Sequence, residues 1–148
     1  MAGPSGRVLM VSMRLPVTVT VAEGTLEVRA SVGGLATGLG QLRGPGRGQW
    51  IGWAGLAAEE TAPHATALAR ALDERGCVGV DIPREELTGF YDDFANGVVW
   101  PLLHDQAGRL PLELAGWDAY RAANRRFADA VVAVAEPGDT IWVHDYQL

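Results

Sequence analysis

The chain has 148 residues, of which 48% are hydrophobic and 20% are charged, and its net charge is −6. This length and composition are typical of one globular domain and exclude a disordered segment. The acidic balance argues against non-specific nucleic-acid binding, which depends on neutralising phosphates. Cys77 is the only cysteine, which excludes an intrachain disulfide and a multi-cysteine metal site. No apolar run resembles a signal peptide or a membrane span, so we expect a soluble cytoplasmic protein.

The first third of the chain predicts strands and a hairpin. Residues 7–12 (RVLMVS) form a short apolar run, which predicts a buried strand. Residues 17–31 alternate between apolar and polar about Glu23-Gly24, as in a hairpin with one exposed face. Gly33 and Gly34 then open a short apolar helix, and residues 49–55 (QWIGWAG) predict a second buried strand.

The rest of the chain alternates between helices and strands. Apolar residues at three- and four-residue steps predict the longest helix, over residues 117–135. A proline suits a first helical turn, so a second helix begins near Pro83. The other predicted elements are an amphipathic helix over residues 65–76, a strand over residues 77–82 and a final buried strand over residues 140–148.

Strands that alternate with helices predict an α/β fold, a mainly parallel sheet covered on both faces. Such sheets bind ligands at the carboxyl ends of their strands. Those ends follow Ser12 and Trp53 and surround His144-Asp145, so Trp53 and His144 are candidate pocket residues. The chain stops at Leu148, directly after a strand, and we therefore expect residues 1–148 to form an incomplete domain.

Two motifs near the first strand suggest anion binding. Arg14 follows that strand, and its planar fork of donors can hold a phosphate. A surface arginine or an ion-pair partner is the commoner role. Gly33 and Gly34 would let backbone N–H groups approach an anion at a helix start, although a glycine pair usually forms only a turn.

Tyr91 and Trp100 stand nine residues apart in YDDFANGVVWPLLHD, which is two and a half turns of a continuous α-helix. A tyrosine hydroxyl can donate to phosphate, and an indole offers a flat wall to a sugar ring. Spacing alone favours core packing for Phe94, Trp100 and Leu103 and boundary packing for Tyr91. The pair His144-Asp145 suggests acid/base work or hydroxyl binding. Core positions are expected for most of Trp50, Trp53, Trp117 and Trp142, and surface positions for His64 and His104.

The order of six motifs is more specific than any one of them. MRLPV, GGLATGL, GWAG, YDDFANGVVWP, WDAYRAANRRFA and VHDYQL together resemble the N-terminal half of the trehalose-6-phosphate synthases, the retaining family 20 glycosyltransferases. The resemblance covers residues 13–148. It implies a GT-B architecture, in which the active site lies between two Rossmann-like domains. Residues 1–148 would be the N-terminal, acceptor-side domain, and the C-terminal nucleotide-sugar domain would be absent.

The resemblance also implies roles for individual residues. Arg14 and Tyr91 would bind the phosphate of the acceptor, glucose 6-phosphate, and Asp145 would bind its hydroxyls. Trp100 would shape the acceptor pocket and its preference for one anomer. The donor's diphosphate would contact the glycine pair Gly33 and Gly34.

The implied reaction moves glucose from UDP-glucose, or another nucleotide glucose, to glucose 6-phosphate with retention of configuration. It needs no metal and no cofactor. The implied partners are these two substrates and either a separate chain with the C-terminal domain or a second copy, with no nucleic acid or membrane. Two alternatives remain open. One is a non-catalytic module that binds a sugar phosphate or a partner, and the other is a related transferase with a glycerol-phosphate or cyclitol acceptor.

Overall fold

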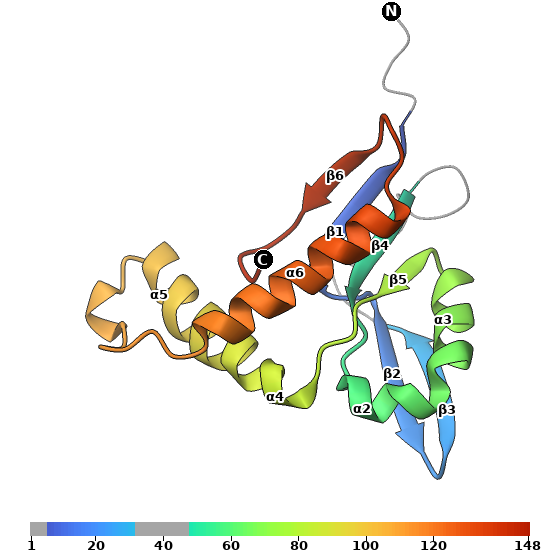
Figure 1. Cartoon of the computed structure of the whole chain (residues 1–148), viewed down its shortest axis with the longest axis horizontal. Coiled ribbons are helices and arrows are strands. Elements are labelled where there is room, and N and C mark those ends of the chain that lie inside the picture. Colours follow the sequence, from blue (N-terminus) through green and yellow to red (C-terminus); the bar gives the residue numbers. More distant parts are fainter. Residues whose placement is uncertain (1–5, 32–47) are drawn as a thin grey trace, which may run out of the picture.

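The computed structural model describes residues 6–31 and 48–148 (Figure 1). Gly33, Gly34 and the helix predicted after them lie outside the described residues. The described strands are β1 (Val8–Arg14), β2 (Val17–Ala22), β3 (Thr25–Ala30), β4 (Gly48–Trp53), β5 (Cys77–Gly79) and β6 (Thr140–Val143). The described helices are α2 (Ala58–Thr61), η2 (Ala62–His64), α3 (Ala65–Asp73), α4 (Arg84–Leu87), η3 (Thr88–Val99), α5 (Trp100–Leu103), η4 (Ala107–Arg109) and α6 (Trp117–Val134).

The predicted parallel α/β sheet is confirmed. Four strands pair in the order β5-β4-β1-β6, and all three pairings are parallel. β1 lies between two neighbours, and Leu9 and Val11 within it are at most 2% exposed. The strand predicted over residues 77–82 ends earlier, at Gly79.

Apolar side chains fill a core on each face of the sheet, because successive strand residues point to opposite faces. Leu9, Val11 and Ile51 share one core with Phe90 and Phe127, which come from η3 and α6. The second core joins β1 and β4 to α3 and to the hairpin of β2 and β3, through Met10, Val17, Val19, Trp50, Leu68 and Leu72. In Figure 1, α6 runs alongside β1, and the hairpin lies beside α3.

The hairpin forms where the alternating pattern predicts it. Val19 pairs with Val28 in the antiparallel register, and the turn lies at Glu23 and Gly24. Both turn residues have positive φ, 50° and 75°. Two successive positive φ values are typical of the type I′ turn, whose twist matches that of the flanking strands.

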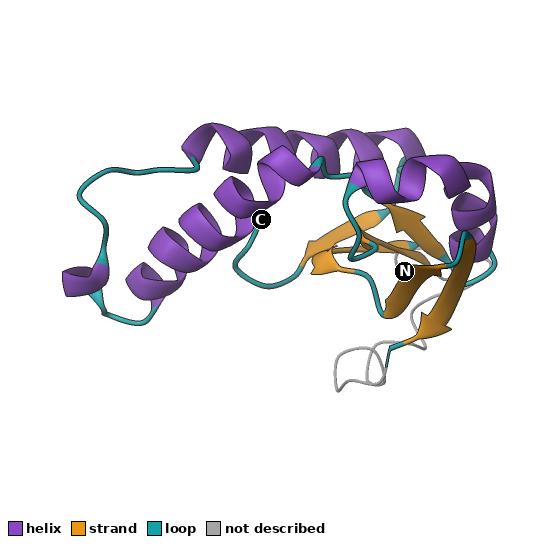
Figure 2. Cartoon of the chain, turned by 90° about the horizontal axis from the view of Figure 1, so that it is seen from below, coloured by secondary structure: helices purple, strands orange, loops and turns teal. Residues whose placement is uncertain are grey.

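The segment of α4, η3 and α5 is helical from Arg84 to Leu103, which confirms the helix predicted from Pro83. Its central part, η3, is a π-helix rather than an α-helix, which the sequence pattern does not predict. This helical arm and the start of α6 extend beyond the strands (Figure 2).

The expectation that the last strand is buried was wrong. β6 is an edge strand, and all four of its residues are exposed. Trp142 within it is 42% exposed, and Trp117 at the start of α6 is 47% exposed, so the core expectation fails for both. Trp50 is only 1% exposed, which confirms the core position expected for it. Among the described residues, only β1 pairs with β6, so the other edge of β6 is unpaired.

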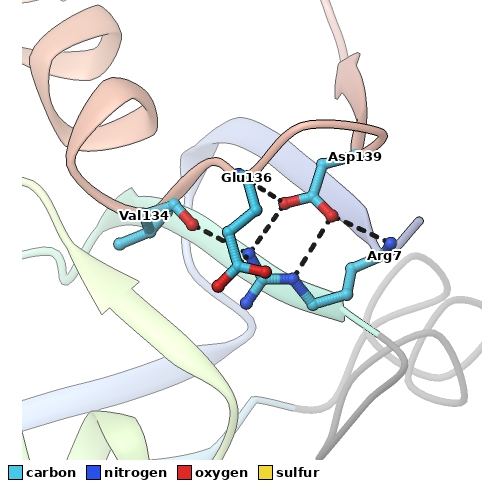
Figure 3. Close-up of polar contacts among 4 residues, drawn as sticks. All are labelled: Arg7, Val134, Glu136 and Asp139. Carbon is cyan, nitrogen blue, oxygen red and sulfur yellow. Dashed lines mark hydrogen bonds and ion pairs between the residues drawn. The ribbon is translucent and has the colours of Figure 1, made fainter.

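One polar cluster fixes the start of β6 (Figure 3). The Arg7 guanidinium and backbone N–H both donate to Asp139, at 2.7 Å to Oδ2 and 2.9 Å to Oδ1. Arg7 also donates to the carbonyl of Val134 at 2.9 Å, and the Glu136 N–H donates to Asp139 at 3.0 Å. These bonds to the ionised carboxylate, chiefly those from Arg7, lower the pKa of Asp139 from 3.8 to about 2.

In the part of the chain that the structure describes, no helix is long and apolar enough to cross a membrane.

Candidate functional site

The carboxyl ends of three strands meet at one edge of the sheet, as the parallel topology predicts. Arg14, at the end of β1, pairs with Trp53, at the end of β4. The His144 N–H, just past β6, donates to the Val11 carbonyl at 2.8 Å. The three strand ends singled out in the sequence therefore lie together.

Arg14 is exposed at this edge, and its guanidinium lies 4.9 Å from the centroid of the Trp53 ring. Gly55, with φ 98°, allows that placement, since a Cβ there would lie 2.8 Å from the Arg14 Nη2. No carboxylate within residues 6–31 and 48–148 forms an ion pair with Arg14. A cation held against an indole without an acidic partner keeps its donors available for an anion.

The π-helix changes the relation between Tyr91 and Trp100. In an α-helix, nine residues would place the two on opposite sides. The wider i→i+5 turn takes about 4.4 residues, so nine residues make roughly two full turns and return to the same side. The ring centroid of Tyr146 lies 4.8 Å from that of Trp100, so the loop after β6 packs against the side of the helical arm that carries Trp100.

Both aromatic side chains face outward. Tyr91 is 37% exposed and Trp100 is 42% exposed, whereas Phe94 between them is buried at 7%. The expectation of core packing is therefore confirmed for Phe94 and wrong for Trp100 and for Leu103, which is 64% exposed. An exposed indole beside an exposed tyrosine at the ligand-binding edge of a sheet can form the wall of a polar site.

Tyr146 and Asn96 are site residues that the sequence did not indicate. The Tyr146 hydroxyl donates to the Asn96 Oδ1 at 2.5 Å and so joins the loop after β6 to the π-helix, across 50 residues of sequence. Burial, with the nearby Asp145 carboxylate, raises the pKa of Tyr146. Neither local spacing nor periodicity could have paired two residues so distant in sequence.

Asp145 adopts a left-handed backbone, with φ 77°. Its Oδ1 accepts a hydrogen bond from the Tyr146 N–H at 2.9 Å, and its side chain is exposed. Left-handed backbone costs a residue with a Cβ about 1–2 kcal/mol, and such strain gathers at functional sites. Asp145 thus presents a carboxylate next to the group of Tyr91, Trp100 and Tyr146.

The two histidines near the group differ. His144 precedes Asp145, and its buried Nδ1 has no hydrogen-bond partner in the part of the chain that the structure describes. His104, expected at the surface, is exposed but not isolated, since its ring centroid lies 3.7 Å from that of Trp100. Its Nδ1 lies 2.8 Å from the Trp100 carbonyl oxygen. Among the described residues, no group of three or more His, Cys, Asp or Glu side chains could hold a metal ion.

The arrangement can bind a phosphorylated, hydroxyl-rich ligand. Arg14 offers charged donors at one side of the edge, and Tyr91 offers a hydroxyl. Asp145 offers acceptors for ligand hydroxyls, and Trp100 offers a flat apolar surface. Charged and neutral donors together with an aromatic wall are typical of polar ligand sites.

Proteins of one family resemble this chain over nearly its whole length. The model of glycosyltransferase family 20 matches residues 6–148. A bifunctional trehalose-6-phosphate synthase/phosphatase of Thermoproteus tenax is 39% identical over 96% of this chain and 20% of its own length. An alpha,alpha-trehalose-phosphate synthase (UDP-forming) of Aspergillus fumigatus is 42% identical over 96% of this chain and 28% of its own. The chain thus spans less than a third of the length of these relatives.

Solved structures give the same result for the fold. A structure described as trehalose-6-phosphate from E. coli, bound with UDP-2-fluoro glucose, superposes on 97% of this chain and on 28% of its own length. The TM-score is 0.65, and the sequences are 25% identical. The trehalose-phosphate synthase of Burkholderia vietnamiensis gives the same TM-score and identity, over 97% of this chain and 29% of its own. With the family model matched over nearly its whole length, the chain belongs to glycosyltransferase family 20.

Proposed function

We propose that this chain is the acceptor-side part of an alpha,alpha-trehalose-phosphate synthase, which transfers glucose from UDP-glucose to glucose 6-phosphate. The observation that carries the proposal is that the loop after β6, which holds the exposed Asp145, contacts the exposed Trp100 through Tyr146, at the end of the sheet where Arg14 also lies. The relatives named as UDP-forming synthases support UDP as the donor nucleotide.

In the proposed reaction, the bond between the anomeric carbon of the donor glucose and the diphosphate breaks. A bond forms from that carbon to the anomeric oxygen of glucose 6-phosphate, and the proton of that oxygen passes to the departing diphosphate. The residues of this chain contribute positioning, since a reactant held in a productive orientation loses less entropy in the transition state. Arg14 and Tyr91 hold the phosphate, Asp145 holds hydroxyls, and Trp100 limits which face of the sugar fits.

Gly33 and Gly34, which lie outside the described residues, are proposed to approach the donor's diphosphate through their backbone N–H groups. We further propose that transfer requires residues beyond those of this chain, because the chain spans 28% of the length of a UDP-forming relative. We therefore expect the chain alone to bind the acceptor without turnover.

The test is a titration of the ¹⁵N-labelled chain with glucose 6-phosphate, glucose and inorganic phosphate, followed by NMR. We expect glucose 6-phosphate to bind most tightly and to shift resonances near Tyr91, Trp100 and Asp145. Arg14→Ala removes a charge-assisted contact and should weaken binding roughly ten- to a hundred-fold. Arg14→Lys should restore part of the affinity, since an ammonium lacks the bidentate fork.

The matched control is Arg29→Ala, because Arg29 is an exposed arginine on β3 that pairs with Glu27 away from the site. It should leave the affinity unchanged. Equal binding of glucose 6-phosphate by the wild type and Arg14→Ala would place the phosphate elsewhere. Binding of glycerol phosphate as tight as that of glucose 6-phosphate would favour a different acceptor.

A further inference from the structure

We propose that His104 is a positioning residue that fixes the Trp100 ring as a wall of the acceptor site. That role assumes the acceptor site proposed above. The two rings lie 3.7 Å apart between centroids at an interplanar angle of 34°. Trp100 is 42% exposed, so the protein interior alone does not determine the orientation of its ring.

The hydrogen bond of His104 fixes its own ring. Its Nδ1 lies 2.8 Å from the carbonyl oxygen of Trp100, one helical turn earlier. A carbonyl oxygen only accepts, so Nδ1 carries the proton and donates. In a neutral imidazole this assigns the lone pair to Nε2. The ring is therefore held by the backbone of the same residue whose side chain it contacts.

The chain geometry places His104 at the turn that ends the helical arm. α5 ends at Leu103, His104 follows with φ −113°, and Asp105 has a left-handed φ of 56°. The chain thus turns sharply at His104 instead of carrying its ring further along the helix. A second ring, that of Tyr146, lies 4.8 Å from Trp100 and is itself held by Asn96. Trp100 consequently contacts one ring from the turn that ends its helix and one from the loop after β6.

A simpler role for His104 is to satisfy a carbonyl at the end of a helix, which polar side chains often do. That role predicts a loss of stability and, as its consequence, the same loss of affinity for every ligand. A role in positioning Trp100 predicts a change in the indole's environment and a selective loss of affinity for a ligand with a sugar ring. The two roles are therefore separable by experiment.

Three substitutions separate the ring contact from the hydrogen bond. His104→Phe keeps a ring but loses the Nδ1 donor, His104→Asn keeps a donor but loses the ring, and His104→Ala loses both. The matched control is His64→Ala, because His64 belongs to η2, away from the aromatic group. The chain is labelled with 5-fluorotryptophan, and the ¹⁹F resonance of Trp100 is assigned from its loss in Trp100→Phe.

We expect the Trp100 resonance to shift in His104→Ala and His104→Asn, to shift less in His104→Phe, and to stay in place in His64→Ala. Aromatic contacts of this kind change affinities roughly two- to ten-fold. His104→Ala should weaken glucose 6-phosphate binding by that factor and leave inorganic phosphate binding unchanged. His104→Phe should retain most of the affinity for glucose 6-phosphate.

An unmoved Trp100 resonance in His104→Ala would overturn the proposal. Equal weakening for glucose 6-phosphate and inorganic phosphate would overturn it too, since a purely structural role gives that result. A wild-type chain that binds neither ligand would instead contradict the proposed acceptor site. The ¹⁹F comparison would still decide whether His104 determines the orientation of the Trp100 ring.

Discussion

The hairpin of β2 and β3 buries one face in the core, through Val17 and Val19, whereas every residue of the edge strand β6 is exposed. The strand pairing of the two regions also differs in range. The hairpin strands pair with each other through a turn of two residues, Glu23 and Gly24. β6 pairs with β1, more than 120 residues earlier, and its faces are open. Side chains from distant parts of the chain secure both of its ends, Arg7 at the start and Asn96 beyond the finish.

This difference has a functional meaning. The loop that follows β6 carries Asp145, and the hairpin carries none of the candidate site residues. A segment held at two ends by specific polar contacts can place a functional carboxylate accurately, although the strand before it buries little apolar surface. Removing those contacts one at a time shows how much each contributes to the stability of β6 and of the loop after it.

The largest loss of stability is expected from Asp139→Ala. The substitution removes the acceptor for the Arg7 guanidinium, the Arg7 backbone N–H and the Glu136 N–H together. The Arg7 guanidinium is left with the Val134 carbonyl and the exposed Glu136 carboxylate, 3.6 Å away. Urea unfolding measures the effect. Glu136→Ala is the control, because Glu136 is 72% exposed and lies 3.6 Å from Arg7, so a comparable loss there would contradict the role of Asp139.

The same contact predicts a pH dependence. The Arg7 guanidinium, with backbone N–H donors, lowers the pKa of Asp139 from 3.8 to about 2. A carboxyl whose pKa is lower in the folded state stabilises the fold above its unfolded pKa, and that stabilisation disappears as the pH falls through the folded pKa. The stability difference between the wild type and Asp139→Asn should therefore be constant above about pH 5 and shrink toward about pH 2.

Urea unfolding of both proteins across this range measures the difference. The Glu59 carboxyl, whose pKa is also lowered by backbone N–H donors, is present in both proteins and cancels. A difference that stays constant down to the lowest pH would show that Asp139 does not titrate with folding.

The next largest effect is expected from Tyr146→Phe, which removes the hydrogen bond from the loop after β6 to Asn96. The change keeps the ring near Trp100 but leaves the Asn96 Oδ1 without its donor at 2.5 Å. An unsatisfied polar group of this kind costs about 1–2 kcal/mol when part-buried. Hydrogen exchange should become faster at residues 144–148 and stay unchanged in the hairpin.

Tyr120→Phe is the matched control for that substitution. Tyr120 is half-buried in an aromatic cluster 4.6 Å from the Phe94 centroid. Within the described residues its hydroxyl makes no hydrogen bond. Faster exchange at residues 144–148 in Tyr120→Phe would show that the loop responds to any loosening of the aromatic cluster.

The sequence predicted the features that depend on neighbouring residues, but not the contacts between residues far apart in the chain. Alternation about Glu23-Gly24 predicts the hairpin and its turn, because a type I′ turn and its strands depend on adjacent residues. The apolar run TIWV predicts a strand, but not its place in the order of the sheet, since strand order depends on which elements meet in three dimensions. The motifs indicated Tyr91, Trp100 and Asp145, whereas the contact of Tyr146 with Asn96 depends on the π-helix, which periodicity did not reveal.

A smaller effect concerns the strained backbone at Asp145. Glycine adopts a left-handed φ freely, and alanine pays about 1–2 kcal/mol there. Asp145→Gly should therefore be more stable than Asp145→Ala by about 1 kcal/mol, measured by thermal unfolding. Both variants lose the carboxylate, so both should bind glucose 6-phosphate more weakly. If Asp145→Gly bound it as tightly as the wild type, the loop conformation rather than the carboxylate would make the site.

The smallest effect is expected at Glu23, another acidic residue with a left-handed backbone, in the hairpin turn. Its φ of 50° and that of Gly24, 75°, match a type I′ turn, for which Asn-Gly is the preferred pair. Glu23→Asn should therefore stabilise the chain by about 0.5 kcal/mol, the lower end of what turn optimisation gives. Because the turn is local, hydrogen exchange should slow in β2 and β3 only, and the affinity for glucose 6-phosphate should not change. Slower exchange at residues 144–148 in this variant would show that the hairpin and the β6 loop are coupled, and the contrast between local and distant support would fail.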